Sequence, residues 1–199
     1  MEKKTPLLPA KPEEFKLPSL NELFSDKIEL AGKSEGLNAI LNIPPPADWI
    51  KVHPVITNYR YLPIDKVELL LRRIFKSYKI EVIREGTAFN GVYVVVRVHY
   101  FNPVTGEMSY HDGIGACQLQ TKSGTSPSDL ININHGAIAM AFPIAKTVAI
   151  KDACDHFGTI FGCNLNRKDT TQFMPDQEII TKSREEKRKE MLIKNGINP

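Results

Sequence analysis

The segment VYVVVRVHY, residues 92–100, constrains the fold more than any other part of the chain. Its β-branched and aromatic side chains favour an extended strand, and alternate residues of a strand point to the same face. Arg97 interrupts the run of valines. Because a buried unpaired charge is costly, we expect Arg97 to point away from the core. The chain must therefore build a β-sheet around residues 92–100.

Two neighbouring segments extend this strand into an antiparallel meander. YKIEVIRE (78–85) alternates apolar and charged residues, and Asn90-Gly91 predicts a turn before residue 92. FNPVTGE (101–107) predicts a second turn, followed by a third strand over MSYHDGIGACQLQ (108–120). Glycines weaken a strand, so Gly113 and Gly115 indicate a bend, a bulge or the close approach of another backbone.

Helical periodicity flanks the meander. PIDKVELLLRRIFKSY (63–78) predicts one helix, with Pro63 in its first turn and apolar residues at helical spacing. A second helix is expected from about residue 137, with Pro143 either kinking it or marking its start. Lys151 falls on the side opposite its apolar face, which comprises Ile138, Phe142, Ala145, Ala149, Ala153 and Phe157. The expected class is α+β, with a β-β-β-α core in which one helix or both lie on a single face of the sheet.

Composition divides the chain into three parts. Residues 1–47 contain seven of the fourteen prolines, which predicts an extended or partly disordered arm with at most one short helix. Residues 48–170 form the expected core. Residues 171–199 are expected to form a charged helical tail with few apolar anchors, solvated or partly disordered.

Bulk properties indicate an ordinary globular protein of the cytoplasm. No apolar run approaches the roughly 18 residues needed to cross a bilayer, and the first fifteen residues lack a signal-peptide apolar region. The three cysteines are an odd count without paired spacing, which favours a reducing compartment. We therefore expect no membrane association.

Motifs for cofactor or metal chemistry are absent. The chain has no phosphate-binding Gly-x-x-x-x-Gly-Lys-Ser/Thr loop, no Gly-x-Ser-x-Gly elbow and no zinc-ligand spacing. A Mg²⁺-dependent nuclease would need carboxylates converging at strand ends, and Glu81, Glu107 and Asp112 lie on the strand system. Glu81 lacks the accompanying carboxylate-x-Lys pattern, so the nuclease stays a minor alternative. We expect no catalytic residue, metal or cofactor.

The charge distribution points to a polyanion. Residues 51–97 contain nine Lys or Arg against four Asp or Glu, an excess of five positive charges. Cations on a folded core neutralise phosphates, and interleaved aromatic rings offer stacking surfaces to unpaired bases. Tyr93, His99 and Tyr100 lie near Arg97 in the sequence. An ordinary solvated surface is the alternative interpretation of these cations.

Two segments together resemble the single-strand annealing family of double-strand-break repair. VVVRVHYFNPVTGEMSYHDGIGA and AKTVAIKDACDHFGTIFGCNL carry a basic strand residue, a turn, Gly113-Ile114-Gly115, a helix with Lys151 and Ala153, and Phe157-Gly158 with Gly162. The family includes a eukaryotic recombination mediator, a mitochondrial nucleoid annealing protein and phage Sak-type recombinases. The resemblance spans about residues 91–168 and does not extend to residues 1–60.

The resemblance implies a ring or helical filament of identical subunits that holds single-stranded DNA in a basic groove and anneals complementary strands without ATP. A partner exonuclease or single-stranded-DNA-binding protein is a further expectation. By position, Lys151 corresponds to the groove lysine and Arg97 to the basic strand residue. Asp152 and Asp155 depart from the family, where basic residues are common. The cations expected to compensate are Arg84, Lys122, Lys146, Arg167 and Lys168.

One other binding class shares the element order. A helix, three strands and a helix also describe a double-stranded RNA-binding domain, which recognises A-form shape through phosphates and 2′-hydroxyls. Such domains place a lysine cluster at the start of the final helix, where this chain has only Lys146 and Lys151. Duplex RNA binding therefore remains the second hypothesis.

Overall fold

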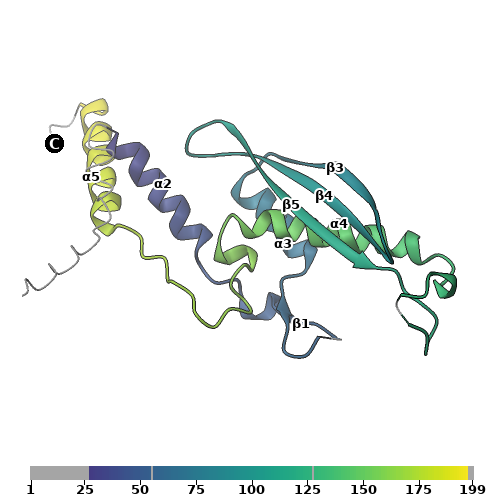
Figure 1. Cartoon of the computed structure of the whole chain (residues 1–199). Coiled ribbons are helices and arrows are strands. Elements are labelled where there is room, and N and C mark those ends of the chain that lie inside the picture. The colour runs from purple at the N-terminus through teal and green to yellow at the C-terminus, as the bar shows by residue number, and fades with distance from the viewer. Residues whose placement is uncertain (1–26, 55, 127, 197–199) are drawn as a thin grey trace, which may run out of the picture.

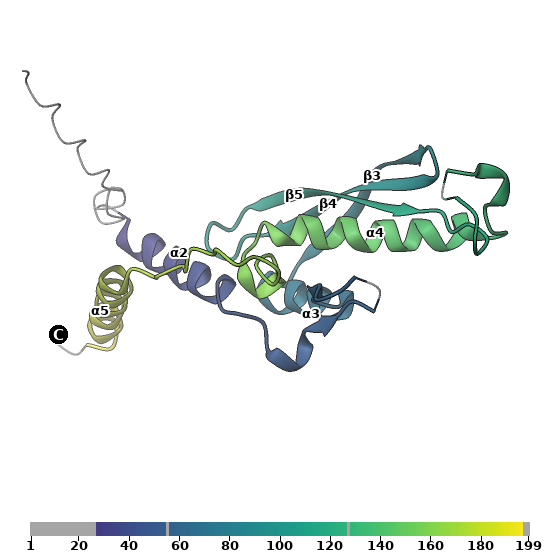
Figure 2. The same cartoon turned by 60° about the horizontal axis from the view of Figure 1, so that its bottom comes forward.

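The computed structural model describes residues 27–54, 56–126 and 128–196. In chain order the elements are α2 (Ile28–Leu41), η1 (Ala47–Trp49), β1 (Lys51–Val52), β2 (Arg60–Tyr61), α3 (Ile64–Ile74), β3 (Tyr78–Ala88), β4 (Gly91–Phe101), β5 (Met108–Gln118), η2 (Leu130–Asn132), α4 (Ala137–Asp155), η3 (Thr159–Phe161) and α5 (Gln177–Lys194). Figure 1 shows the sheet lying over α4, and Figure 2 shows α3 and the β1–β2 hairpin on the other side of α4.

The central sheet confirms the expected α+β class. Strands β3, β4 and β5 are antiparallel and neighbours in that order, with Glu81 opposite Arg97 and Arg97 opposite Asp112. The register shifts between Val82 and Arg84, where β3 contains a bulge. The alternation of β4 sorts its side chains, because Val92, Val94, Val96 and Val98 are buried whereas residues between them, including Arg97, are only partly so.

The two strand glycines allow α4 to approach the sheet closely. A Cβ placed on Gly113 would collide with the backbone of Ala149 and Ala153, and one on Gly115 would collide with the backbone of Ala145 and Ala149. Of the three explanations that the sequence leaves open, close approach of another backbone is therefore the correct one. The bulge of this sheet lies in β3 instead.

The buried face of α4 is an alanine stripe. Residues four apart pack on the sheet, namely Ala137, Ala141, Ala145, Ala149 and Ala153. Ile138, expected on this face, is 51% exposed. The close contact between α4 and the sheet has room only for small side chains, so the larger Ile138 side chain lies outside it. Cys154, next to Ala153, is also fully buried. The helix begins at Ala137 and runs through Pro143, so Pro143 does not mark its start.

An aromatic cluster closes the core at the end of α4. The ring of Phe157 lies 4.5 Å from that of Phe75 at the end of α3, centroid to centroid, and 4.7 Å from Tyr100 of β4. Phe161 stacks on the same group, with its ring 5.0 Å from that of Phe157. The Phe-Gly ending thus joins α3, β4 and α4 in one core.

The two outer helices pack against each other beside the sheet body, as both views show. Residues 28–41 form α2, so this part of the expected extended arm is helical; residues 1–26 lie outside the described residues. Helix α5 begins at Gln177, within the expected tail of residues 171–199, and Ile179 is fully buried. The backbone N–H of Asp176 donates to the buried Glu35 carboxylate at 2.6 Å. The contact between α2 and α5 stabilises both helices, and it cannot be predicted from local sequence.

Candidate nucleic-acid interface

Arg97 lies on the open face of the sheet, which α4 does not cover. Its Nε and Nη2 each donate to a carboxylate oxygen of Asp112 at 2.7 Å. The guanidinium stands 3.9 Å from the centroid of the Tyr110 ring. The hydrogen bond from Arg97 lowers the pKa of Asp112, since it stabilises the charged carboxylate. The sequence correctly predicted the direction of this side chain, but its charge is already matched by a bidentate partner.

A groove separates α4 from the β1–β2 hairpin. It has a volume of about 720 Å³, and α4 contributes an apolar wall that includes Met140, Ile144 and Val148. The hairpin contributes His53, Tyr59 and Tyr61, whose rings meet edge to face. Mutual hydrogen bonds between Arg60 and Asn166, both 2.7 Å, attach the hairpin to the segment that follows η3.

Lys151 projects into this groove from α4. Its Nζ lies 4.6 Å from the centroid of the Tyr61 ring, so the ammonium faces the π-system of an aromatic residue. Burial lowers the pKa of Lys151, while the charges of Asp155 and Asp65 act in the opposite direction. Among the described residues, Lys151 forms no ion pair within 4.0 Å. A half-buried cation beside a partly exposed ring can bind a phosphate next to a base.

The two acidic residues next to Lys151 on α4, Asp152 and Asp155, have different environments. Asp152 accepts a hydrogen bond at 2.9 Å from the backbone N–H of Ile114, on the outer edge of β5. Asp152 thus ties α4 to the sheet edge. Asp155 lies at the end of α4, where partial burial, followed by the charge of Asp152, raises its pKa to about 6, although the residue as a whole remains exposed. An anion at a helix C-terminus is also unfavourable to the helix dipole.

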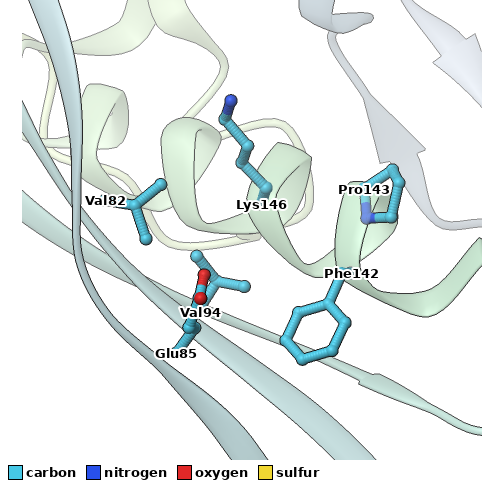
Figure 3. Close-up of a pocket in the computed structure, with 6 residues that line it drawn as sticks. All are labelled: Val82, Glu85, Val94, Phe142, Pro143 and Lys146. Atoms are coloured by element: carbon cyan, nitrogen blue, oxygen red, sulfur yellow. The ribbon is translucent and has the colours of Figure 1, made fainter. Parts of the chain in front are cut away.

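The remaining predicted cations are distributed over the molecule. Arg167, whose charge lowers the pKa of Asp155, lies in the exposed segment that the hairpin holds, and Lys168 follows it. Lys146 instead lines a separate pocket of about 390 Å³ between α4 and the edge strand β3 (Figure 3). Arg84 shares the open face with Arg97, and Lys122 lies in the loop after β5.

The structure therefore brings together one subset of the predicted residues. Lys151 and Arg167 act on the same carboxylate, Asp155, beside the groove, whereas Arg97 lies on the far side of the sheet from α4. Sequence reasoning missed His53, Tyr59 and Tyr61. The signal for the two tyrosines is the alternation in NYRYLP, residues 58–63, but its two-residue strand is too short to be recognised.

Of the three carboxylates considered for a nuclease, two are bonded to other side chains and the third lies in a turn. Glu81 is hydrogen-bonded to His99 at 2.9 Å, Asp112 pairs with Arg97, and Glu107 lies in the β4–β5 turn. Within residues 27–54, 56–126 and 128–196, no three His, Cys, Asp or Glu side chains form a group that could hold a metal ion. Over the same ranges, no helix has the length and apolar character needed to cross a membrane.

Comparison with known proteins adds no relative. No family model matches the sequence, and a search of the curated proteins finds no match.

Proposed function

We propose that this chain binds single-stranded DNA as a homo-oligomer and anneals complementary strands without ATP. The observation that supports this function best is the position of Lys151, half-buried over Tyr61 in a groove between α4 and the hairpin. A cation next to an aromatic ring suits a phosphate next to an unpaired base, and the order of elements matches the β-β-β-α core of the family that the sequence resembles.

The mechanism requires binding and alignment only. Each subunit contributes a weak contact through Lys151, with Arg167 and Lys168 beside the groove. A ring or filament aligns such contacts along one strand, and multivalency then raises the overall affinity. Contacts to phosphate carry no sequence information, while base edges stay free to test pairing with a second strand.

The groove lysine is tested by the salt dependence of binding. We expect Lys151→Gln to weaken binding to a fluorescent single-stranded oligonucleotide and to reduce the slope of log K against log salt by about 0.7 per subunit contact. Lys182→Gln on α5 is the matched control, because it removes one lysine remote from the groove. Annealing of complementary oligonucleotides should fall with Lys151→Gln and stay unchanged with Lys182→Gln.

The oligomer is tested by mass measurement of the purified protein with and without single-stranded DNA. A monomer under both conditions would contradict the proposal. The order α3–β3–β4–β5–α4 is shared with double-stranded RNA-binding domains, so duplex RNA is the competitor of choice. Preferential binding of duplex RNA would replace annealing with that second function.

A further inference from the structure

A second basic surface lies at the end of α3, away from the groove. Residues 72–79, RRIFKSYK, contain four cations and no acidic residue, and span the last turn of α3, the following turn and the start of β3. Arg72, Arg73, Lys76 and Lys79 are all exposed. This set of four residues, called the α3-end patch, is the densest part of the basic excess in residues 51–97, and the groove does not include it.

Two of the four cations have their charge available. Arg72 is held by Glu68 at 3.1 Å and donates to the Tyr78 hydroxyl at 3.2 Å, and Lys79 lies 3.6 Å from Glu81. Among the described residues, Arg73 and Lys76 form no ion pair within 4.0 Å. The α3-end patch thus keeps net positive charge after its internal pairs are counted.

The backbone at Lys76 is an independent indication that the side chain matters. Lys76 follows the C-cap residue Phe75 and has φ of +60°, the left-handed conformation that glycine adopts most easily at this position. A lysine there is strained, and such strain concentrates at functional positions. Helix-dipole stabilisation accounts for cations in the last turn of α3, but it does not require a lysine in the left-handed region.

The α3-end patch lies on a path that starts at the groove. The first turn of α3 is close to Lys151, because the charge of Asp65 acts on the pKa of that lysine. Helix α3 has 11 residues and is therefore about 16 Å long. A strand that leaves the groove along α3 reaches the patch at the other end of the helix.

We propose that the α3-end patch is a second binding site for nucleic-acid phosphates, distinct from the groove. Arg73 and Lys76 contact the backbone of DNA, and Arg72 and Lys79 add to the local potential. Exposed cations recognise phosphate rather than bases, so the site accepts either the bound single strand or the annealed duplex. The choice of DNA as ligand rests on the proposed function.

The test compares two charge-matched double variants of the full chain. Arg73→Gln/Lys76→Gln removes the two available charges, and Arg188→Gln/Lys189→Gln removes one Arg and one Lys from exposed positions of α5. Affinities for a single-stranded oligonucleotide and for its annealed duplex are measured over a range of salt. The first variant should reduce the salt slope by about 1.4 for single strands or about 1.8 for duplex, and the second should leave both slopes unchanged.

The two DNA probes identify the ligand, since the site binds the form of DNA for which Arg73→Gln/Lys76→Gln reduces the salt slope.

Lys76→Gly separates the effect on binding from the effect on stability. Glycine relieves the left-handed backbone, so we expect a higher Tm together with a slope lower by about 0.7 for single strands. This second site alone would be overturned if Lys151→Gln weakens DNA binding while Arg73→Gln/Lys76→Gln leaves both salt slopes unchanged. It would also be overturned if Arg73→Gln/Lys76→Gln loses binding to vesicles of anionic lipid but binds DNA like the wild type.

Discussion

The open face of the sheet and the groove beside α4 each contain a cation, a tyrosine ring and a carboxylate, but in different arrangements. On the open face, Arg97 stacks on Tyr110 and forms a bidentate pair with Asp112. In the groove, Lys151 stands over Tyr61 with Asp155 nearby, but within the described part of the chain no ion pair within 4.0 Å holds its ammonium. One cation is neutralised by its neighbour, whereas the other keeps its charge at the cost of partial desolvation.

This difference shows that residue type and strand position do not decide whether a charge can bind a ligand. Arg97 and Lys151 are equally plausible DNA contacts in the sequence. In the fold, register places Asp112 directly opposite Arg97, while helical geometry points Lys151 into a hollow lined by another element. The partner on the neighbouring strand therefore determines which cation stays available.

The largest expected effect separates the covered side of the sheet from the open side. Gly115→Val should lower the free energy of unfolding by about 3 kcal/mol or more, because its side chain would meet the backbone of Ala145 and Ala149. Ala116→Val, on the next residue and the opposite face, should change it by less than about 0.5 kcal/mol. Urea denaturation of both variants measures the difference. Equal losses would mean that α4 does not pack against this face.

A smaller effect distinguishes the two cations by stability. Arg97→Ala should lower Tm because Asp112 loses its partner, and a double-mutant cycle with Asp112→Ala should show coupling between the two residues. Lys151→Met should leave Tm unchanged or raise it slightly, since it removes a partly desolvated charge and keeps the apolar stem. The comparison fails if Lys151→Met costs more stability than Arg97→Ala.

The smallest effect concerns pH and the charge of Asp155. Its pKa of about 6 lies above the ordinary value of 3.8, so the folded state takes up the proton first and becomes more stable as pH falls through about 6. The charges that act on it are those of Asp152, which raises its pKa, and of His156, Arg167 and Lys151, which lower it. Asp155→Asn should therefore raise Tm at pH 7.5, with a gain that shrinks toward pH 5.

Asp152→Asn tests the cause of this shift, because it removes the neighbouring charge that adds to the raised pKa of Asp155. Stability should then depend less on pH between pH 5 and 8 than it does in the wild type. A constant Tm difference for Asp155→Asn across pH 5 to 8 would show that the carboxylate does not titrate in this range.

The central elements follow from local sequence, whereas the outer ones do not. Alternation over residues 92–100 predicts β4 and its buried face, and helical spacing over residues 63–78 predicts α3. Helix α2 was missed in a proline-rich region, because its stability comes from contact with α5 and from the Glu35 bond to the start of that helix. The Asp152 contact was equally unpredictable, since it joins residues 38 positions apart.

The sequence by itself determined the α+β class, the three-strand meander, the outward direction of Arg97 and the position of Lys151 on the side of its helix away from the sheet. These features depend on periodicity within one element. Only the tertiary structure decided that Gly113 and Gly115 let α4 approach the sheet closely, that Asp112 pairs with Arg97, and that Tyr61 and Lys151 line the same groove. Such contacts join separate elements, and their geometry depends on how those elements pack.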